Sequence, residues 1–173
     1  MTAGTKYAEP RAHALRERYV AAFGGDELPV PAEAIAEDLL GLHVSEADLA
    51  GVSGLLYPAR RRIVLNAADG PERKRFTLAH ELGHWICQCV DAAEPQEVFC
   101  RAEDVTLDPE ARAVEREANI FAAELLMPEP AVAERFTPSR SVADLADEFG
   151  VSPLALAWRL YGLGLVPNKP VYS

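Results

Sequence analysis

Runs of apolar residues, separated by polar and turn-forming residues, divide the chain into short predicted elements. Residues 12–19 and 32–40 are predicted to form two short helices with a glycine- and proline-rich turn between them. The apolar segments 54–57 and 62–66 bracket the turn 58–61, a pattern typical of a β-hairpin whose second strand is the better defined. The first part of the chain therefore predicts helices followed by a small sheet.

Two long helices are predicted in the middle of the chain, each with a start signal. Asp69-Gly70-Pro71-Glu72 combines a capping acid with a first-turn proline, and this helix is expected to run to about Cys87. Asp108-Pro109-Glu110 starts the second helix in the same way, and Met127-Pro128 ends it. Residues 141–165 predict two shorter helices. The fold class expected from these elements is α+β.

The first long helix carries the sequence His80-Glu81-Leu82-Gly83-His84. A spacing of four places both imidazoles on one helical face, about one turn apart, so that two ring nitrogens can bind one Zn²⁺. Glu81 follows the first histidine, where its carboxylate can act as general base on the attacking water without being a ligand. The same five-residue pattern also arises by chance, but here it lies inside a helix with a start signal and directly after a strand.

A hydrolytic zinc site needs three protein ligands and one open position, so a third ligand is expected from another element. On the second long helix Glu115 and Asn119 are four residues apart and share a face. Glu115 is the candidate ligand, and Asn119 the candidate hydrogen-bond partner for the far nitrogen of a ligand histidine. Glu117, which has no polar partner on its own face, is the alternative ligand. Both acids are also compatible with solvated charges on an amphipathic helix.

Two motifs in this order resemble one known family. The segment RFTLAHELGH (residues 75–84), followed by EREANIFAAELLMP (residues 115–128), is similar to the ImmA/IrrE-type metallopeptidases, and the similarity covers most of the chain beyond about residue 30. The resemblance implies a zincin-like fold in which His80, His84 and Glu115 bind zinc and Glu81 is the catalytic base. It also implies that the protein substrate is a helix-turn-helix repressor, whose cleavage induces a stress response or mobile-element excision.

We divide the chain into three expected parts. Residues 1–30 are a helical extension, residues 31–136 a zincin-like metallopeptidase domain, and residues 137–173 a helical subdomain that looks like a helix-turn-helix. The second helix of that subdomain carries one cation, Arg159, whereas reading DNA bases requires several basic and amide side chains. We therefore expect this helix not to bind nucleic acid. We expect it to bury its large apolar residues against the catalytic domain, namely Leu154, Leu156, Trp158 and Leu160.

Composition and charge narrow the possible partners and location. Hydrophobic residues make up 49% and charged residues 25% of the chain, which excludes a wholly disordered protein. The formal net charge of −10 disfavours DNA and anionic lipid as partners. Since no apolar run reaches the length of a membrane span and the first ten residues do not resemble a signal peptide, we expect a cytoplasmic protein without a membrane segment.

Several other features have competing interpretations. Cys87, Cys89 and Cys100 are candidates for a second metal site or an oxidant sensor, although thiols that pack as small apolar residues are favoured. The basic runs 60–62 and 73–75 are either a docking patch for an acidic substrate segment or, as we favour, solvated positions. The strand 62–66 is the candidate edge for adding an extended peptide.

The leading function is a narrowly specific cytosolic zinc endopeptidase. The alternative is a zinc-stabilised protein-binding or antitoxin-like regulatory module that does not cut its partner. Glu81 distinguishes the two, because zinc binding alone does not require it.

Overall fold

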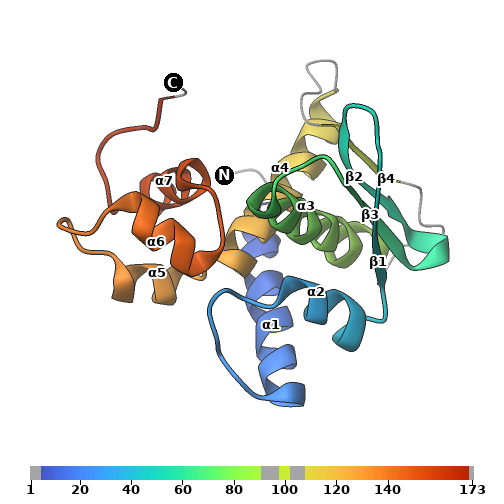
Figure 1. Cartoon of the computed structure of the whole chain (residues 1–173), viewed down its shortest axis with the longest axis horizontal. Helices are drawn as coiled ribbons and strands as arrows, with labels where there is room; N and C mark the ends of the chain where they lie inside the picture. Colours follow the sequence, from blue (N-terminus) through green and yellow to red (C-terminus); the bar gives the residue numbers. More distant parts are fainter. Residues whose placement is uncertain (1–4, 91–97, 102–107, 172–173) are drawn as a thin grey trace.

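The computed structural model describes residues 5–90, 98–101 and 108–171 (Figure 1). In chain order the described elements are α1 (Thr5–Phe23), α2 (Ala32–Ala34), β1 (His43–Ala47), β2 (Val52–Tyr57), β3 (Arg62–Asn66), α3 (Pro71–His84), β4 (Val98–Arg101), α4 (Pro109–Leu126), α5 (Glu129–Arg135), α6 (Val142–Phe149) and α7 (Pro153–Gly162). Single π-helical turns, Ile35–Leu39 and Trp85–Cys89, follow α2 and α3, and the 3-10 turn Pro58–Arg60 joins β2 to β3. The predicted α+β class is confirmed.

The sheet has the strand order β1-β3-β2-β4. β1 pairs with β3 in parallel, whereas β2 is antiparallel to both β3 and β4, so the predicted hairpin of residues 54–57 and 62–66 is confirmed. The strand 62–66, the candidate for adding an extended peptide, is not an edge, because β3 has a strand on each side. Its residues 63–66 are all buried, which is the pattern of a strand covered on both faces. Among the described strands the edges are β1 and β4, neither of which was predicted.

Helix α3 lies between the sheet and α4 (Figure 1), and α1 packs on α4. Glycines allow both close approaches of α3. A Cβ atom added to Gly54 of β2 would lie 2.5 Å from Cγ2 of Thr77, and one added to Gly83 would lie 3.0 Å from Cα of Ala118. Because glycine has no Cβ, β2 and α3 can pack closely at Gly54, and α3 and α4 can pack closely at Gly83, without a clash. The histidine-bearing helix is thereby held between β2 and α4.

The sequence predicted the N-terminal cap of α4 correctly, but not that of α3. Asp108 caps α4, and its Oδ1 accepts a hydrogen bond from the Ala111 N–H at 2.8 Å, as predicted. For α3 the predicted cap is wrong, because Gly70 is the N-cap residue and no side chain caps the helix. Asp69 instead pairs with Arg73 at 3.3 Å. The proline at the first helical position is enough to set the start of α3.

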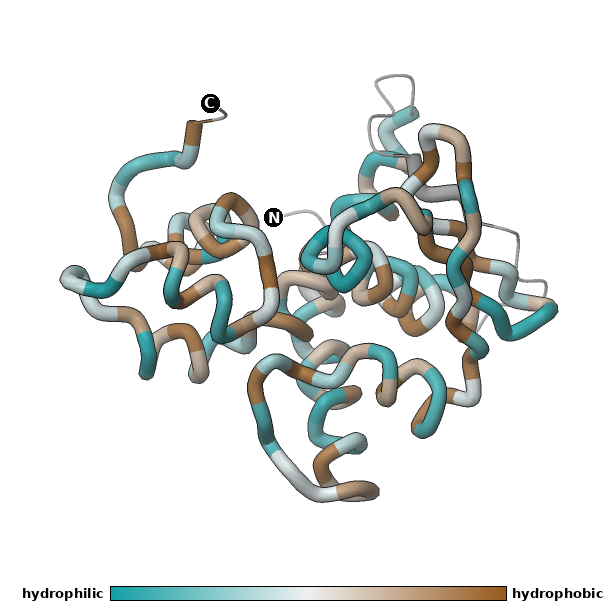
Figure 2. The backbone as a smooth tube through the Cα atoms, in the orientation of Figure 1, coloured by the Kyte–Doolittle hydropathy of each residue, from teal (hydrophilic) through white to brown (hydrophobic). Residues whose placement is uncertain are grey.

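The C-terminal helices α6 and α7 form as predicted, and α5 precedes them unpredicted. Hydrophobic positions recur along both (Figure 2), and the large side chains Leu156 and Leu160 are fully buried. Trp158 is half-buried, but Leu154 is 39% exposed, so the expected burial of Leu154 is wrong. No helix within the described ranges has the length and apolar character needed to cross a membrane.

Candidate metal centre

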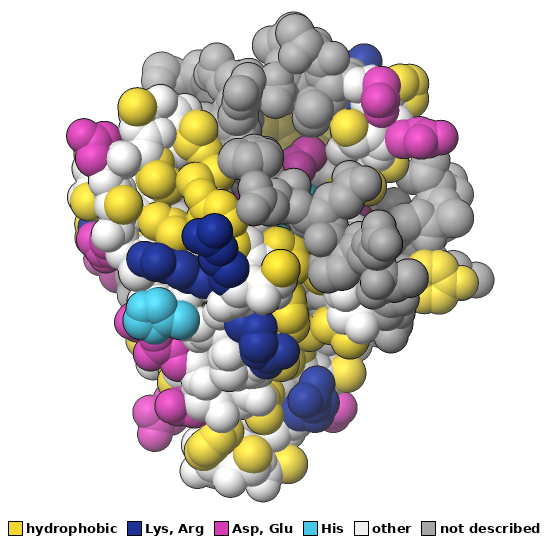
Figure 3. Space-filling model, turned by 90° about the vertical axis from the view of Figure 1, so that its right-hand side faces the viewer, with side chains coloured by type: hydrophobic (Ala, Val, Ile, Leu, Met, Phe, Trp, Pro, Cys, Tyr) yellow, Lys and Arg dark blue, Asp and Glu magenta, His cyan; other side chains and the backbone are white. Residues whose placement is uncertain are grey.

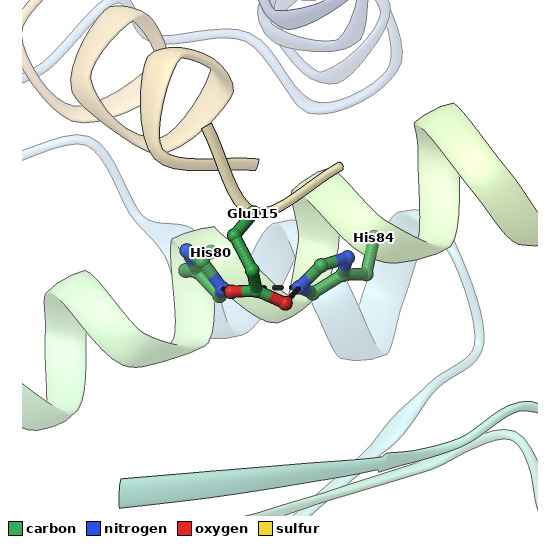
Figure 4. Close-up of side chains that lie close together, drawn as sticks. All are labelled: His80, His84 and Glu115. Carbon is green, nitrogen blue, oxygen red and sulfur yellow. Dashed lines mark hydrogen bonds and ion pairs between the residues drawn. The ribbon is translucent and has the colours of Figure 1, made fainter. Parts of the chain in front are cut away.

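Three side chains from α3 and α4 converge on one point (Figure 4). The Nε2 atoms of His80 and His84 are 3.0 Å apart, as their spacing of four on one helix allows. The carboxylate of Glu115, from the second turn of α4, lies between the two rings. Its Oε2 is 3.1 Å from Nε2 of His80, and its Oε1 is 3.3 Å from Nε2 of His84. One ligand atom from each residue lies within 4.8 Å of the others.

The outer nitrogens of both rings face side-chain amides. Nδ1 of His80 is 2.9 Å from Oδ1 of Asn119, the partner that the sequence suggested. Nδ1 of His84 is 2.9 Å from Oε1 of Gln88, a contact that the sequence analysis missed although Gln88 follows His84 by four residues. An amide oxygen only accepts hydrogen bonds, so each Nδ1 donates, and a neutral ring then has its Nε2 lone pair toward the other ring and the carboxylate.

Burial and charge together make the centre attract a positive charge. His84 is fully buried, His80 is nearly so, and the Glu115 side chain is 28% exposed. Burial raises the pKa of Glu115, but its hydrogen bonds to His80 and His84 outweigh burial and hold the pKa at about 2. Burial lowers the pKa of His84, but Glu115 and the nearby charge of Glu81 outweigh it, so this pKa is raised. Without a metal ion, a proton supplies the positive charge.

The donor set fits a metal ion. Two imidazole nitrogens and one carboxylate oxygen present lone pairs to one another, an arrangement that is repulsive unless a cation lies among them. The same three donors, with one position left open, are the usual set of a catalytic zinc centre. Among the described residues, His80, His84 and Glu115 make up the group of histidine, cysteine and acidic side chains whose ligand atoms come this close.

Glu81 lies next to this group and faces the sheet. Its side chain is fully buried, and a Cβ atom added to Gly54 of β2 would lie 2.9 Å from its Oε1. The carboxylate is close enough to His84 to raise the pKa of that ring. Glu81 is therefore held beside the three converging donors without being one of them, as a general base requires.

Glu117, the alternative ligand, is outside the group and contacts Gln88 instead. Cys87 and Cys89 are also outside it. Cys89 is buried and Cys87 is half-buried. Burial raises the pKa of both thiols, that of Cys87 to about 11, so the reactive thiolate is scarce near neutral pH. The backbone of Cys100 lies in β4, and its side chain is outside the described residues.

Cations of both basic runs bind within the chain. Arg61 donates to the carbonyl oxygens of Gly41 and Leu40, and its guanidinium lies 5.2 Å from the centre of the Trp85 ring. Lys74 pairs with Glu46 at 2.7 Å. Lys and Arg side chains gather on one face of the molecule beside hydrophobic ones (Figure 3), but these two have partners inside the fold. Their contacts favour a role in holding loops over one in docking.

A cavity of about 600 Å³ lies between α3, α4 and the tail. Asn119, which holds His80, is part of its wall, so the cavity adjoins the candidate metal centre. Most of its lining is apolar, α7 contributes Trp158 and Arg159, and Leu163 directly follows α7. The tail therefore helps to shape the surroundings of the centre.

Comparison with known proteins gives consistent relatives. Residues 37–161 match the model of the IrrE N-terminal-like domain family. The chain is 33% identical over 157 residues to the radiation response metalloprotease IrrE of Deinococcus radiodurans, and 29% identical over 150 residues to the IrrE of Deinococcus deserti. These matches cover 88% and 84% of this chain but 45% and 52% of the relatives, so the chain spans about half their length.

A solved structure has a similar fold. A Mycobacterium tuberculosis transcriptional regulator matches with a TM-score of 0.60 and 21% identity, over 87% of this chain and 46% of that one. At this identity the match supports the fold alone.

Proposed function

The chain belongs to the IrrE N-terminal-like family, and from that membership we propose that it is a zinc-dependent endopeptidase that cleaves one specific protein partner. The observation that carries the proposal is the convergence of His80, His84 and Glu115, with their ligand atoms within 4.8 Å of one another. Two imidazoles and one carboxylate leave an open position for substrate. A purely structural zinc site uses all four positions for protein ligands.

The residues around the centre have separate roles in the proposed reaction. When bound, zinc would polarise the scissile carbonyl and lower the pKa of the attacking water. Glu81 receives the proton of that water and delivers it to the leaving amine. Its full burial beside Gly54 restricts the carboxylate to one position. Asn119 holds the ring of His80 in the orientation that directs Nε2 inward.

We propose that residues 31–136 are the catalytic unit and that residues 1–30 and 137–173 are helical additions to it. Two contacts attach the helical additions to the proposed catalytic unit. Helix α1 packs against α4, and Arg159 of α7 binds Glu124 of α4. Arg159, the only cation of α7, is buried in this contact and is not available to a phosphate. The tail accordingly serves packing and partner contact in this proposal, and not DNA reading.

The proposed substrate is a helix-turn-helix repressor whose cleavage switches on a stress or mobile-element response. Its support is the resemblance of the two motifs to the ImmA/IrrE-type peptidases, together with the relatives named as radiation response metalloproteases. The substrates to test are helix-turn-helix repressors from the same organism. Zinc-loaded protein should cut one of them at one site, detected by mass spectrometry, and a chelator should stop the reaction.

Glu81→Gln separates the proposed base from the metal. Glutamine preserves shape but cannot take the proton, so the cleavage rate should fall about 10²–10⁴-fold while zinc content stays at the wild-type level. Glu72→Gln, the same change at an exposed position of α3, is the matched control and should cut normally. Wild-type cleavage by Glu81→Gln would show that the mechanism is wrong. If the wild type never cuts, and both proteins suppress the repressor equally, the non-proteolytic binding module is correct.

A further inference from the structure

His84 is the first member of a hydrogen-bonded chain that leads away from the metal centre. Its Nδ1 is 2.9 Å from Oε1 of Gln88, and Nε2 of Gln88 donates to Oε2 of Glu117 at 2.9 Å. Gln88 belongs to the π-helical turn that follows α3, and Glu117 belongs to α4. The chain thus connects the two helices on the side of His84 that faces away from Glu115.

We propose that Gln88 and Glu117 are positioning residues that fix the tautomer of His84, so that its Nε2 lone pair is always directed at the metal. The inference rests on the proposed function only for the metal, and not for peptide cleavage. The named contacts also give Glu117 a role of its own: it acts on the centre through Gln88 and is not the alternative ligand.

The direction of each hydrogen bond follows from the carboxylate at the end of the chain. An ionised carboxylate only accepts, so the NH₂ group of Gln88 must face Glu117. The amide oxygen of Gln88 must then face His84, and the only donor that the ring can offer it is Nδ1–H. Without Glu117, the two ends of the amide are nearly equivalent in shape and either could face the ring. Glu117 removes that ambiguity.

His80 and His84 differ in how much they need hydrogen-bond partners that fix the tautomer of the ring. His80 bonds to Asn119, an exposed residue whose amide can also bond to water. His84 is fully buried, and Gln88 and Glu117 are half-buried. In a buried position a wrongly directed amide leaves a polar atom without a partner, which costs about 1–3 kcal/mol. The buried ring is therefore the one that requires a fixed chain of partners.

Zinc affinity of the intact protein, measured by competition with a chromophoric chelator, tests the proposal without any cleavage assay. Glu117→Gln frees the Gln88 amide to turn, and we expect zinc to bind about 10–100-fold more weakly. The double variant Gln88→Glu/Glu117→Gln rebuilds the chain with the carboxylate and amide exchanged, and should bind zinc within a few-fold of wild type or more tightly. Glu110→Gln, at an exposed position of the same helix, is the matched control and should leave the affinity unchanged.

A nitrogen-15 NMR spectrum of the zinc-loaded protein reads the hydrogen bond from His84 to Gln88, because zinc on Nε2 leaves the ring proton on Nδ1, where an acceptor such as Oε1 of Gln88 protects it from exchange with water. The Nδ1–H signal of His84 should weaken or disappear in Glu117→Gln and return in the double variant, while the Nδ1–H signal of His80 stays constant as an internal control.

Unchanged affinity and an unchanged His84 signal in Glu117→Gln would overturn the proposal. So would loss of the bound zinc as complete as that in Glu115→Ala, because Glu117 would then be a ligand. A wild type that binds zinc with the expected His84 signal but cuts no repressor would contradict the proposed function and leave this inference standing.

Discussion

Two of the acids of α4 have different surroundings, Glu115 in its second turn and Glu124 near its end. Glu124 is buried against Arg159 of α7, which donates to its Oε2 and, through Nε, to the carbonyl oxygen of Met127 at 3.0 Å. Glu115 faces His80 and His84, whose ring nitrogens carry lone pairs. The cation that pairs with Glu124 is a side chain of the protein, whereas Glu115 and the two imidazoles can bind a cation from solution.

The pKa values of the two acids express this difference. Burial raises the pKa of Glu124, and the attraction of Arg159 does not fully offset it. Burial also raises the pKa of Glu115, but the imidazoles outweigh it and the value falls to about 2. Glu115 is therefore ionised at any pH at which the protein is expected to work. The end of α4 near Glu124 holds the tail, and the end near Glu115 is ready to bind a cation.

The largest expected effect is on stability and follows from removing Arg159, the cation that pairs with Glu124 near the end of α4. Arg159→Met leaves Glu124 buried without its partner, which typically costs about 3–5 kcal/mol, so the free energy of unfolding should fall by that amount in denaturant titrations. The double variant Glu124→Met/Arg159→Met should recover most of the loss, because a buried pair replaced by apolar groups is often neutral. Zinc affinity should change little in either variant. A large loss of zinc affinity without loss of stability would show that the two ends of α4 are not independent.

Removing Glu115 should abolish the stabilisation of the folded protein by zinc. A ligand at about 100 times its Kd stabilises the folded state by about 2.7 kcal/mol, and this increment should be present in the wild type and close to zero in Glu115→Ala. Thermal unfolding with zinc and with a chelator measures it. Glu124→Gln, on the same helix, should keep the full increment. The assignment of Glu115 is wrong if Glu115→Ala keeps full zinc affinity while Glu117→Ala loses it.

The smallest effect is a dependence of zinc binding on pH. The pKa of His84 is raised above 6.5 in the metal-free protein, so below that raised value zinc must displace a proton. Affinity should then fall about tenfold, or 1.4 kcal/mol, for each unit of acidification. Zinc titrations at several pH values check the slope. An affinity that stays constant, or rises, as the pH falls would contradict it.

His84 and Glu115 also determine how the stability of the metal-free protein changes with pH. The raised pKa of His84 contributes stability below 6.5, which is lost as the pH rises through the raised value. The lowered pKa of Glu115 contributes stability above 4.5, which is lost as the pH falls toward about 2. Their contact therefore stabilises the metal-free form most between pH 4.5 and 6.5, and this stabilisation is lost above 6.5 as the pH rises through the raised pKa of His84. Chelator-treated protein should show this window in its melting temperature.

Short-range patterns determined much of this protein from the sequence. The spacing of His80 and His84 places both rings on one face of any α-helix, whatever surrounds it. The Asp108 cap of α4 and the β2–β3 hairpin likewise depend on residues close together in the chain. The motifs also identified the family, because a metal site needs particular residue types at particular spacings.

Only the tertiary structure decided matters that depend on distant parts of the chain. The strand of residues 62–66 is central because β1 and β2 pair on its two sides, and Arg159 is buried because α7 packs on α4. The spacing within α4 favoured Glu115 over Glu117 without excluding either. The close packing of α3 on α4 at Gly83 places Glu115 between the imidazoles and Glu117 against Gln88. Helical periodicity sets which residues share a face, but only contact between helices sets which face meets the other helix.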